Sequence, residues 1–393
     1  MKHLSVVMLR MGVCILLFLS LLATVTGMNA SADEPIRIGT IFSITGWAGF
    51  IGTPQKEVFT AMIDDINNKG GIDGRPIEFL YEDDKSVPTN AVIAVTKLIK
   101  DKKVVAIVGS STSDAALALV NVCERERVPF INSGPARIPF KKYIFSVGPG
   151  DLRCAAHLLE YSVKDMGAKR IALFHGSDAY GMLGATTIKD EMSKYPQASI
   201  IIEETLEPAD TNMIPQLTKI KAANPDILLL YTTGGPAGVV AKNYKQLGMK
   251  TQVIGGNAIT MPDFLKIAGD IAEESRWIFL SQPLMIVDMM SPDDPYRKNV
   301  YEPFRDLMRQ AYGPEKDVTL FHASSYDAIK AITEAMKLAK TIDSDHIRDA
   351  LEKVKIEGFI GPFAPTPTDH QGAQVDPMRP MILKDKRFVP YPM

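Results

Sequence analysis

The sequence contains little cysteine, little tryptophan and almost no excess charge. Its 393 residues include 3 cysteines and 2 tryptophans, and the formal net charge at pH 7 is −2. A chain so close to neutrality lacks the basic surface by which proteins bind nucleic acids, so no nucleic-acid partner is expected. Beyond the first 32 residues no stretch is long and apolar enough to predict a membrane span. That part of the chain contains Cys123 and Cys154, which could pair in an oxidising compartment or be two buried small side chains.

The motifs of common catalytic, phosphate-binding and metal sites are missing as well. The chain has no G-x-S-x-G turn, no G-x-x-x-x-G-K-[ST] loop, and no C-x-x-C, H-E-x-x-H or calcium-loop pattern. The histidines beyond the N-terminal segment fall in no recognisable motif; they are His157, His175, His322, His346 and His370. These absences argue against an enzyme and predict neither a cofactor nor a bound metal.

The N-terminal segment has the composition of a secretory signal peptide. Lys2 and Arg10 form a basic region, residues 11–26 are apolar, and Ala30-Ser31-Ala32 offers an A-x-A cleavage site. The sequence therefore predicts an exported protein that is cleaved near Ala32.

From Ile36 onward, apolar strands alternate with helices in two successive series. The strands are near-continuous apolar runs, which is typical of parallel strands buried on both faces. Strands are expected at 36–44, 77–84, 104–108 and 128–134 in the first series, at 170–176, 199–206, 226–234 and 252–256 in the second, and at 277–284, 358–365 and 381–391 near the end. The alternation predicts an α/β fold with two doubly wound parallel-sheet lobes.

The stretch IVGSSTSDAA, residues 107–116, ends a strand in four hydroxyl residues just before a helix. A nucleophile turn and a phosphate cradle would need partner residues that the chain lacks, which leaves a clamp for another ligand. Ligands of open α/β sheets bind beyond the carboxyl ends of the strands, and a helix start there offers free N–H groups to an anion. We expect hydroxyls of Ser110–Ser113 to bind ligand, while Ser113 or Asp114 caps the helix; capping alone is the alternative.

Several stretches together carry a resemblance to a known family. They are IRIGTIFSITGWAGFIG, INNKGGIDGRPIEFLYEDD, VVAIVGSSTS, VPFINSG, HGSDAYG, NPDILLLYTTG and SSYDAIKAI, in family order over essentially the whole mature chain. On these motifs the chain resembles the type I periplasmic solute-binding proteins, the leucine/isoleucine/valine-binding family of ABC importers. The resemblance implies a monomeric periplasmic protein whose two lobes close on a small-molecule ligand by hinge motion and dock transiently on a membrane ABC permease.

The resemblance also implies lobe boundaries and a set of ligand-binding residues. Three crossovers are expected near 148–151, 281–284 and 359–362, which gives a signal peptide at 1–32, an N-terminal lobe of 33–149 and 283–358, and a C-terminal lobe of 150–282 and 359–393. The implied site residues are Trp47, Ser110, Ser111, Thr112, Ser133 and Gly134 in the first lobe and Tyr180, Gly234, Gly235 and Asn257 in the second. Trp47 and Tyr180 are expected to sandwich the apolar body of the ligand.

Some positions depart from the amino-acid-binding relatives. Asn257 stands where those relatives typically carry a glutamate that pairs with the ligand's ammonium, and a neutral amide could not neutralise a buried cation. An aromatic side chain is missing near Gly234 and Gly235, which leaves room for a larger ligand, and Ala136 replaces a threonine. The expected ligand is therefore a small carboxylate, amino-acid-like or aromatic, with an unmodified branched-chain amino acid disfavoured.

A few residues and functions stay open. Arg137 could bind a carboxylate at the pocket rim or belong to a solvated loop, and His175 could line the pocket or be an ordinary strand-end histidine. In YEDDK, Asp83 and Asp84 either fix a loop, face solvent or approach the cleft. Two rival functions remain: a module that presents bound solute to a signalling receptor and, more weakly, an enzyme on the same fold.

Overall fold

The computed structural model describes residues 34–134, 136, 138–147, 151–316, 318–359, 361–371 and 378–391. The expected signal peptide, Arg137 and part of the first expected crossover, 148–150, lie outside these ranges. From Ile36 onward the described residues form one compact unit, which holds both lobes. Within the described ranges, no helix combines the length and the apolar character that crossing a membrane requires.

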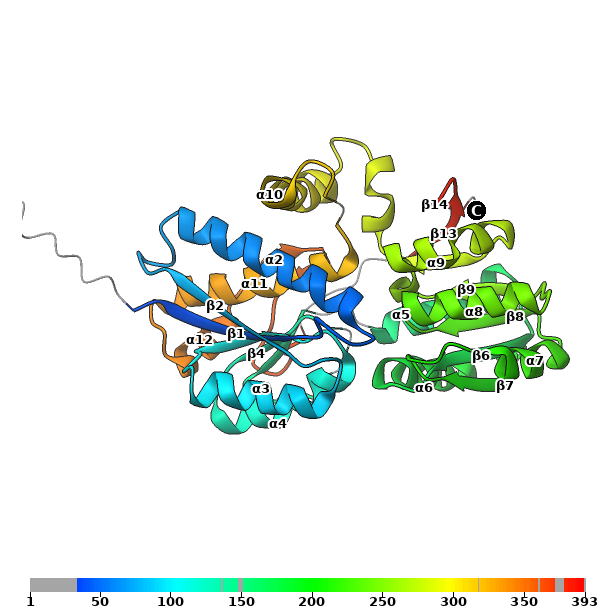
Figure 1. Cartoon of the computed structure of the whole chain (residues 1–393), viewed down its shortest axis with the longest axis horizontal. Coiled ribbons are helices and arrows are strands. Elements are labelled where there is room, and N and C mark those ends of the chain that lie inside the picture. Colours follow the sequence, from blue (N-terminus) through cyan, green and yellow to red (C-terminus); the bar gives the residue numbers. More distant parts are fainter. Residues whose placement is uncertain are drawn as a thin grey trace, which may run out of the picture. The chain divides into compact units, whose positions relative to one another are not determined.

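The first lobe is built on a five-stranded parallel sheet (Figure 1). In spatial order its strands are β2 (Ile77–Asp83), β1 (Ile36–Phe42), β3 (Ala106–Gly109), β4 (Phe130–Asn132) and β5 (Ile144–Ser146). Its helices are α2 (Gly49–Asn68), α3 (Pro88–Lys100), α4 (Ser113–Glu126), the π-helical turn η5 (Arg297–Tyr301), α10 (Glu302–Tyr312), α11 (Leu320–Ala339) and α12 (Ser344–Leu351).

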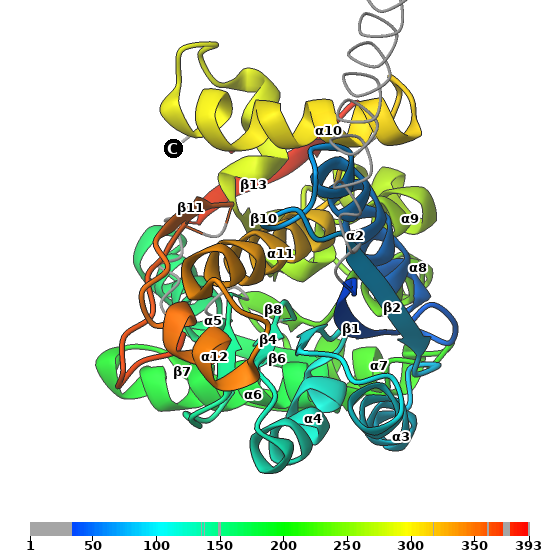
Figure 2. The same ribbon diagram turned by 90° about the vertical axis from the view of Figure 1, so that its left-hand side faces the viewer.

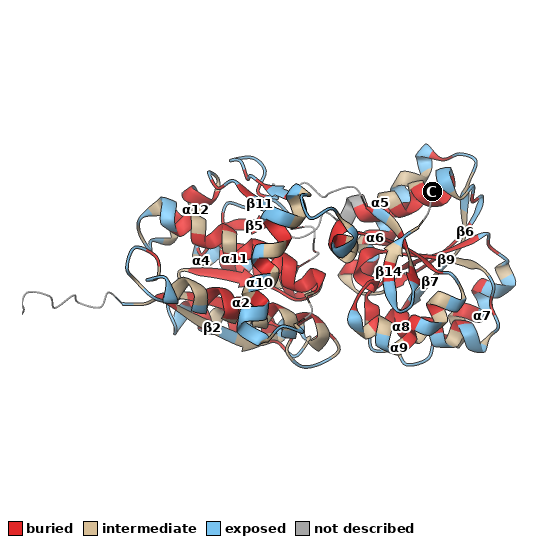
Figure 3. Cartoon of the chain, turned by 90° about the horizontal axis from the view of Figure 1, so that it is seen from above, coloured by how far each residue is buried: buried red, intermediate tan, exposed pale blue. Residues whose placement is uncertain are grey.

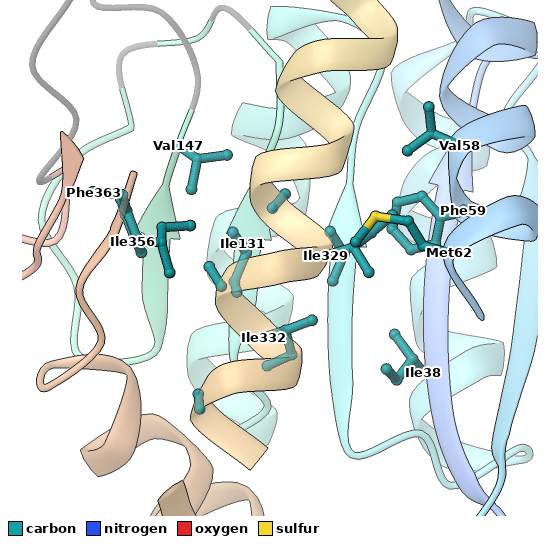
Figure 4. Packing of buried hydrophobic residues seen from close by; sticks show 14 of the residues in the cluster. Ile38, Val58, Phe59, Met62, Ile131, Val147, Ile329, Ile332, Ile356 and Phe363 are labelled. Atoms are coloured by element: carbon teal, nitrogen blue, oxygen red, sulfur yellow. The ribbon is translucent and has the colours of Figure 1, made fainter. Parts of the chain in front are cut away.

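Helices cover both faces of this sheet, as the near-continuous apolar strands predict. Ala106 and Val108 of β3 pack with α2 and α11, whereas Ile107 between them packs with α3 and α4 on the opposite face (Figure 2). In the first of these cores, Phe59 of α2 lies close to Ile329 of α11 (Figure 4). The side chains of a strand alternate between two buried faces, which is why all four residues of β3 are apolar and buried.

The second lobe carries a seven-stranded sheet. In spatial order its strands are β14 (Arg387–Pro390), β13 (Arg379–Lys384), β10 (Ile278–Ser281), β9 (Gln252–Gly255), β8 (Ile227–Tyr231), β6 (Arg170–Gly176) and β7 (Ser199–Leu206). Its helices are α5 (Asp151–Glu160), which continues as the π-helical turn η1 (Tyr161–Asp165), α6 (Ala179–Glu191), the short η2 (Met192–Lys194), α7 (Ile214–Ala223), α8 (Gly234–Gln246), the short η3 (Asn257–Ile259) and α9 (Pro262–Glu274). The strands from β10 to β7 are parallel, but β13 and β14 form an antiparallel hairpin added to that sheet. The central strands of both sheets are buried, whereas β2, β7, β13 and β14 carry partly exposed residues, as do the outer faces of the helices (Figure 3).

The structure moves one expected lobe boundary. Phe359 and Phe363 pack in the first-lobe core, and the ring of His370 stacks on Phe145 with centroids 3.9 Å apart. β11 (Ile356–Gly358) and β12 (Gly361–Phe363) form a separate two-stranded ladder. The assignment of everything from residue 359 to the second lobe is therefore wrong, because apolar contacts hold this segment to the first lobe and the chain rejoins the second sheet only at β13.

The earlier return to the first lobe passes through η4 (Pro283–Met289), directly after β10. Leu284 and Val287 of this segment pack in the first-lobe core, whereas Met285 and Ile286 pack against the second-lobe core. The segment therefore contacts both lobes at the point where the chain crosses between them.

One expected helix start also differs. The sequence favours a start at Thr53-Pro54, but α2 begins at Gly49. Glycine makes the earlier start possible, because a Cβ added at Gly52 would lie 2.2 Å from the carbonyl oxygen of Ser43 at the end of β1. The helix can therefore begin immediately beside the strand it follows.

The two cysteines of the described chain are buried, and no disulfide joins them. Cys123 lies in the core formed with α3 and α4, and Cys154 lies in the core of the second lobe. Burial raises the pKa of the Cys123 thiol, which is typical of an inert structural cysteine. Of the two alternatives, the structure shows two buried small side chains.

Candidate ligand-binding site

A cavity that is partly open to solvent lies where strand-end turns of the two lobes meet. Its described lining residues are Trp47, Ile51, Ser111, Thr112, Ser113, Ser133, Asp178, Tyr180, Thr233, Asn257, Ala258, Leu320, Phe321 and Ser324. Apart from the start of α11, these residues follow the carboxyl ends of strands β1, β3, β4, β6, β8 and β9. This is the edge at which open α/β sheets bind ligands.

The structure brings six of the expected site residues together. Trp47, Ser111, Thr112, Ser133, Tyr180 and Asn257 line the cavity. Ser110, Gly134, Gly234, Gly235 and His175 are not among its described lining residues, and Arg137 lies outside the described residues.

The hydroxyl turn after β3 is largely occupied by its own hydrogen bonds. Ser110 Oγ donates to the Thr112 carbonyl oxygen (3.0 Å), and Ser111 Oγ accepts from the Ser43 N–H (2.9 Å). Thr112 caps α4, since its Oγ1 accepts from the Ala115 N–H (3.2 Å). The expectation that Ser113 or Asp114 caps this helix is wrong, because Thr112 has the extended backbone of an N-cap and the chain is already helical at Ser113.

Ser113 is the member of this turn that remains available. Its side chain is 3% exposed and lines the cavity, and its Oγ has no hydrogen-bond partner among the described residues. It occupies the first turn of α4, where backbone N–H groups lack intrahelical acceptors. A buried hydroxyl beside a positive helix end is suited to an acceptor that carries negative charge.

A fully buried glutamine connects the first-lobe turns. Gln55 Nε2 donates to the Ser110 carbonyl oxygen (3.2 Å) and to Ser133 Oγ (3.3 Å), and its Oε1 accepts from Ser111 Oγ (2.6 Å). One side chain of α2 therefore fixes the turns after β3 and β4. Sequence reasoning missed Gln55, because nothing in the pattern of a helix marks a polar residue that faces inward.

The loop that carries Trp47 is held from the end of β2. Asp83 accepts from the N–H groups of Ile44 (2.9 Å) and Thr45 (3.2 Å) and from Thr45 Oγ1 (2.7 Å). Ser86 Oγ donates to the Thr45 carbonyl oxygen (2.9 Å) and accepts from the N–H of Ala48 (3.0 Å). Partial burial works to raise the pKa of Asp83, but these hydrogen bonds outweigh it and hold the pKa below its usual value. Among the roles left open for Asp83, the structure shows loop fixation.

On the second-lobe side, the ring of Tyr180 is 3% exposed and stacks on Tyr231 with centroids 4.7 Å apart. Asn257 is 1% exposed, and its Oδ1 accepts from the Cys154 thiol (3.1 Å). Both side chains are thus fixed from behind by residues of their own lobe. Thr233, the N-cap residue of α8, lines the same wall.

Two carboxylates meet where α4 of the first lobe approaches α6 of the second. Asp178 caps α6, as its Oδ1 accepts from the Gly181 N–H (2.9 Å), and Asp114 Oδ2 accepts from the N–H of Ala179 across the lobes (3.3 Å). Burial raises the pKa of Asp178, and the charge of Asp114 adds to that rise. Asp178 lines the cavity, although sequence reasoning did not select it.

The remaining expected residues have other surroundings. The Nδ1 atom of His175 lies 2.7 Å from the Gly176 carbonyl oxygen, and its Nε2 lies 3.1 Å from Glu203 Oε1, so this histidine is held within its own lobe. A Cβ added at Gly234 would face Met261, 3.2 Å away. Beside Gly234, the expected room is therefore bounded by packed side chains.

Beside Gly235, the nearest side chain comes from the first lobe. A Cβ added there would lie 3.9 Å from Phe50 Cε1, and the Phe50 ring lies edge-to-face with Phe321 of α11. Sequence reasoning also missed the α11 residues Leu320, Phe321 and Ser324, which come from a part of the chain far from the other first-lobe turns. Their proximity to the resemblance stretch SSYDAIKAI is the signal that would have pointed to them.

Comparison with known proteins agrees with this architecture. A match to the periplasmic binding protein family covers residues 35–386. The Leu/Ile/Val-binding protein homolog 3 of Brucella melitensis is 24% identical over 255 residues, which cover 64% of this chain and 69% of the relative. The leucine-specific-binding protein of Salmonella typhimurium is 22% identical over 90% of this chain and 91% of its own length.

Solved structures share the fold. An extracellular ligand-binding receptor from Rhodopseudomonas palustris HaA2 superposes with a TM-score of 0.83 at 24% identity, over 91% of this chain and 99% of that chain. A branched-chain amino acid transporter substrate-binding protein from Streptococcus pneumoniae, in complex with isoleucine, has a TM-score of 0.77 at 24% identity, over 90% and 97% of the two chains. A solute-binding protein from Rhodopseudomonas palustris BisB5, in complex with 3,4-dihydroxybenzoic acid, has a TM-score of 0.76 at 22% identity, over 91% and 95%.

The family match extends over nearly the whole described chain, and the cavity occupies the strand-end edge between two α/β lobes. Members of this family are substrate-binding proteins rather than enzymes; they bind small molecules outside the cytoplasm and work with ABC transporter permeases. The chain belongs to the periplasmic binding protein family.

Proposed function

We propose that this protein captures a small carboxylate with an apolar body, amino-acid-like or aromatic, and delivers it to an ABC permease. The observation that carries the proposal is the Ser113 hydroxyl, which is buried, lines the cavity at the start of α4 and has no partner among the described residues. A ligand carboxylate would accept from this hydroxyl and from the free N–H groups of the first helical turn. The other hydroxyls of the turn serve mainly to hold that helix start in place.

The rest of the cavity suits an apolar body. Trp47 and Tyr180 come from opposite lobes, and Phe321 with Ile51 and Leu320 adds further apolar surface. Aromatic side chains bury large areas and fit flat or branched apolar groups. The bound ligands of the two solved neighbours, isoleucine and 3,4-dihydroxybenzoic acid, are both compact carboxylates and represent the two forms that we propose.

The proposal includes an export step and a closing motion. Removal of residues 1–32 near Ala32 would release a monomeric periplasmic protein. Contacts such as the bond from Ala179 N–H to Asp114 form only when the lobes approach, so ligand and lobe closure support each other.

A thermal-shift screen of the mature protein, unfolded and refolded to remove ligand, tests the proposal. Each acid is paired with its own amide: leucine with leucinamide, and phenylacetate with phenylacetamide. A ligand that binds the folded state raises the melting temperature with concentration. We expect shifts from acids and much smaller shifts from amides. Equal shifts within every pair would show that the carboxylate is not what the protein recognises.

A further inference from the structure

Asp178 is the acidic side chain in the described lining of the cavity. Its helix-capping role uses Oδ1, which accepts from the Gly181 N–H at 2.9 Å. A carboxylate has acceptor positions on both oxygens, so this bond to Oδ1 uses only part of its acceptor capacity. Asparagine or serine would also cap α6, but a carboxylate in addition interacts favourably with the positive end of the helix.

Besides the positive end of α6, the described chain places no basic side chain in an ion pair with Asp178. His175 is engaged by the Gly176 carbonyl oxygen and by Glu203. Asp114 of the opposite lobe adds a second negative charge at the same helix start. When ligand fills the cavity and displaces water, a carboxylate without a positive partner becomes costly.

The position where the resemblance places the ammonium partner is neutral here. Asn257 carries no charge, and its Oδ1 already accepts from the Cys154 thiol at 3.1 Å. The negative charge of the second-lobe wall is therefore found after β6 rather than after β9. Asn257 alone would disfavour an amino group in the ligand. The second-lobe wall as a whole can accept one, because Asp178 carries the negative charge that Asn257 lacks.

We infer that Asp178 is the specificity-determining residue of the cavity and holds the ammonium group of the ligand. This inference rests on the proposed capture of a carboxylate and narrows it to an amino-bearing, zwitterionic carboxylate. Ser113 of the first lobe then meets the ligand's negative end and Asp178 of the second lobe meets its positive end. A ligand with both charges stabilises the closed arrangement of the lobes, whereas a simple acid engages one wall.

Paired ligands and a charge-only variant test the inference. Calorimetric titrations of refolded, ligand-free mature protein compare leucine with 4-methylpentanoate and phenylalanine with 3-phenylpropanoate; each pair differs by the amino group. The variants are Asp178→Asn, which keeps a cap for α6, and Asp343→Asn. Asp343 is the matched control, because it caps α12 far from the cavity by accepting from the N–H groups of Asp345 and His346.

We expect the wild type and the control to bind at least one amino acid roughly tenfold or more tightly than its desamino partner, as a charged hydrogen bond implies. In Asp178→Asn that preference should disappear, while the desamino acid binds as before. Two results would overturn the role of Asp178 and leave carboxylate capture intact. One is equal or tighter binding of the desamino acids by the wild type. The other is a preference for the amino acid that persists in Asp178→Asn. If none of the four carboxylates nor their amides bound, the proposed function itself would fail.

Discussion

The two walls of the cavity differ in how firmly their polar groups are held. On the first-lobe wall, Gln55 links the turns after β3 and β4, and Asp83 and Ser86 hold the loop that carries Trp47. On the second-lobe wall, the described hydrogen bonds of the Asp178 and Asn257 side chains are fewer: Asp178 accepts from backbone N–H groups at the start of α6, and Asn257 accepts from the Cys154 thiol. The comparison suggests that the first wall presents a fixed carboxylate and aromatic site, while the second wall selects among ligands that fit it.

The largest effect is expected from removing the link on the first wall. Gln55→Leu keeps the volume but leaves the Ser111 hydroxyl and the Ser110 carbonyl oxygen without their buried partner. We expect the free energy of unfolding to fall by about 2–4 kcal/mol, measured by urea denaturation of ligand-free protein. Gln246→Leu, on the exposed end of α8, is the control. A loss as small as that of the control would mean that the first wall is not held in this way.

Asp83→Ala should loosen the loop that carries Trp47, although Asp83 is not among the described residues that line the cavity. The variant removes three hydrogen bonds to Ile44 and Thr45, so the loop should sample more positions. We expect ligand affinity to fall by roughly 5- to 10-fold. Trp47 should also become more accessible to iodide; the second tryptophan, Trp277, is 0% exposed and stays protected from this quencher.

Glu82→Ala provides the comparison for this change, since Glu82 is the neighbouring residue of β2 and pairs with Lys97 (2.7 Å). It should alter neither affinity nor quenching. Unchanged quenching in Asp83→Ala would show that the Trp47 loop holds its position by packing alone, and the contrast between the two walls would then rest on Gln55.

Most of the fold could be predicted from the sequence, because buried parallel strands leave apolar runs bounded by turn residues. Strands 170–176 and 199–206 coincide with β6 and β7. The predicted lobe boundary at 359 was wrong because the segment from there to His370 has little regular structure. Which lobe it joins is decided by contacts between distant residues, such as the stacking of His370 on Phe145.

Part of the site could also be predicted, since Trp47, Ser111 and Asn257 follow strands at the expected edge. Asp178 was not predicted as a site residue, because its position in the sequence is typical of a helix cap. Only the three-dimensional structure shows that this cap also lines the cavity. Gln55 and the start of α11 were missed for a similar reason. Helical patterns show which face is apolar, but they do not show which polar residue points inward toward a distant turn.

A smaller effect should separate two serines of the turn after β3, Ser113 and Ser110. Ser113→Ala removes an unpartnered hydroxyl that lines the cavity, so affinity for acids should fall by about 3- to 10-fold while the melting temperature stays close to that of the wild type. Ser110→Ala removes a hydroxyl bonded to the Thr112 carbonyl oxygen, so it should lower the melting temperature more than affinity. The reverse pattern would show that Ser110, and not Ser113, binds the ligand.

The smallest effect concerns the second wall in the absence of ligand. Burial raises the pKa of Asp178 above its unfolded value, so the folded state holds its proton more tightly. The stabilisation from this group is complete below the unfolded pKa and is lost as the pH rises through the folded pKa. We therefore expect Asp178→Asn to gain stability over the wild type as the pH rises from about 4 to 7, by a few tenths of a kcal/mol. The control behaves differently: a hydrogen bond from His346 lowers the pKa of Asp343 below its usual value of 3.8. The stabilisation from Asp343 is therefore complete above that pH and is lost only at lower pH, so Asp343→Asn should keep a nearly constant offset from the wild type between about pH 4 and 7. Melting temperatures across this pH range distinguish the two slopes. Parallel slopes would mean that Asp178 is as well compensated as a surface cap, and the second wall would then have no charge waiting for a ligand.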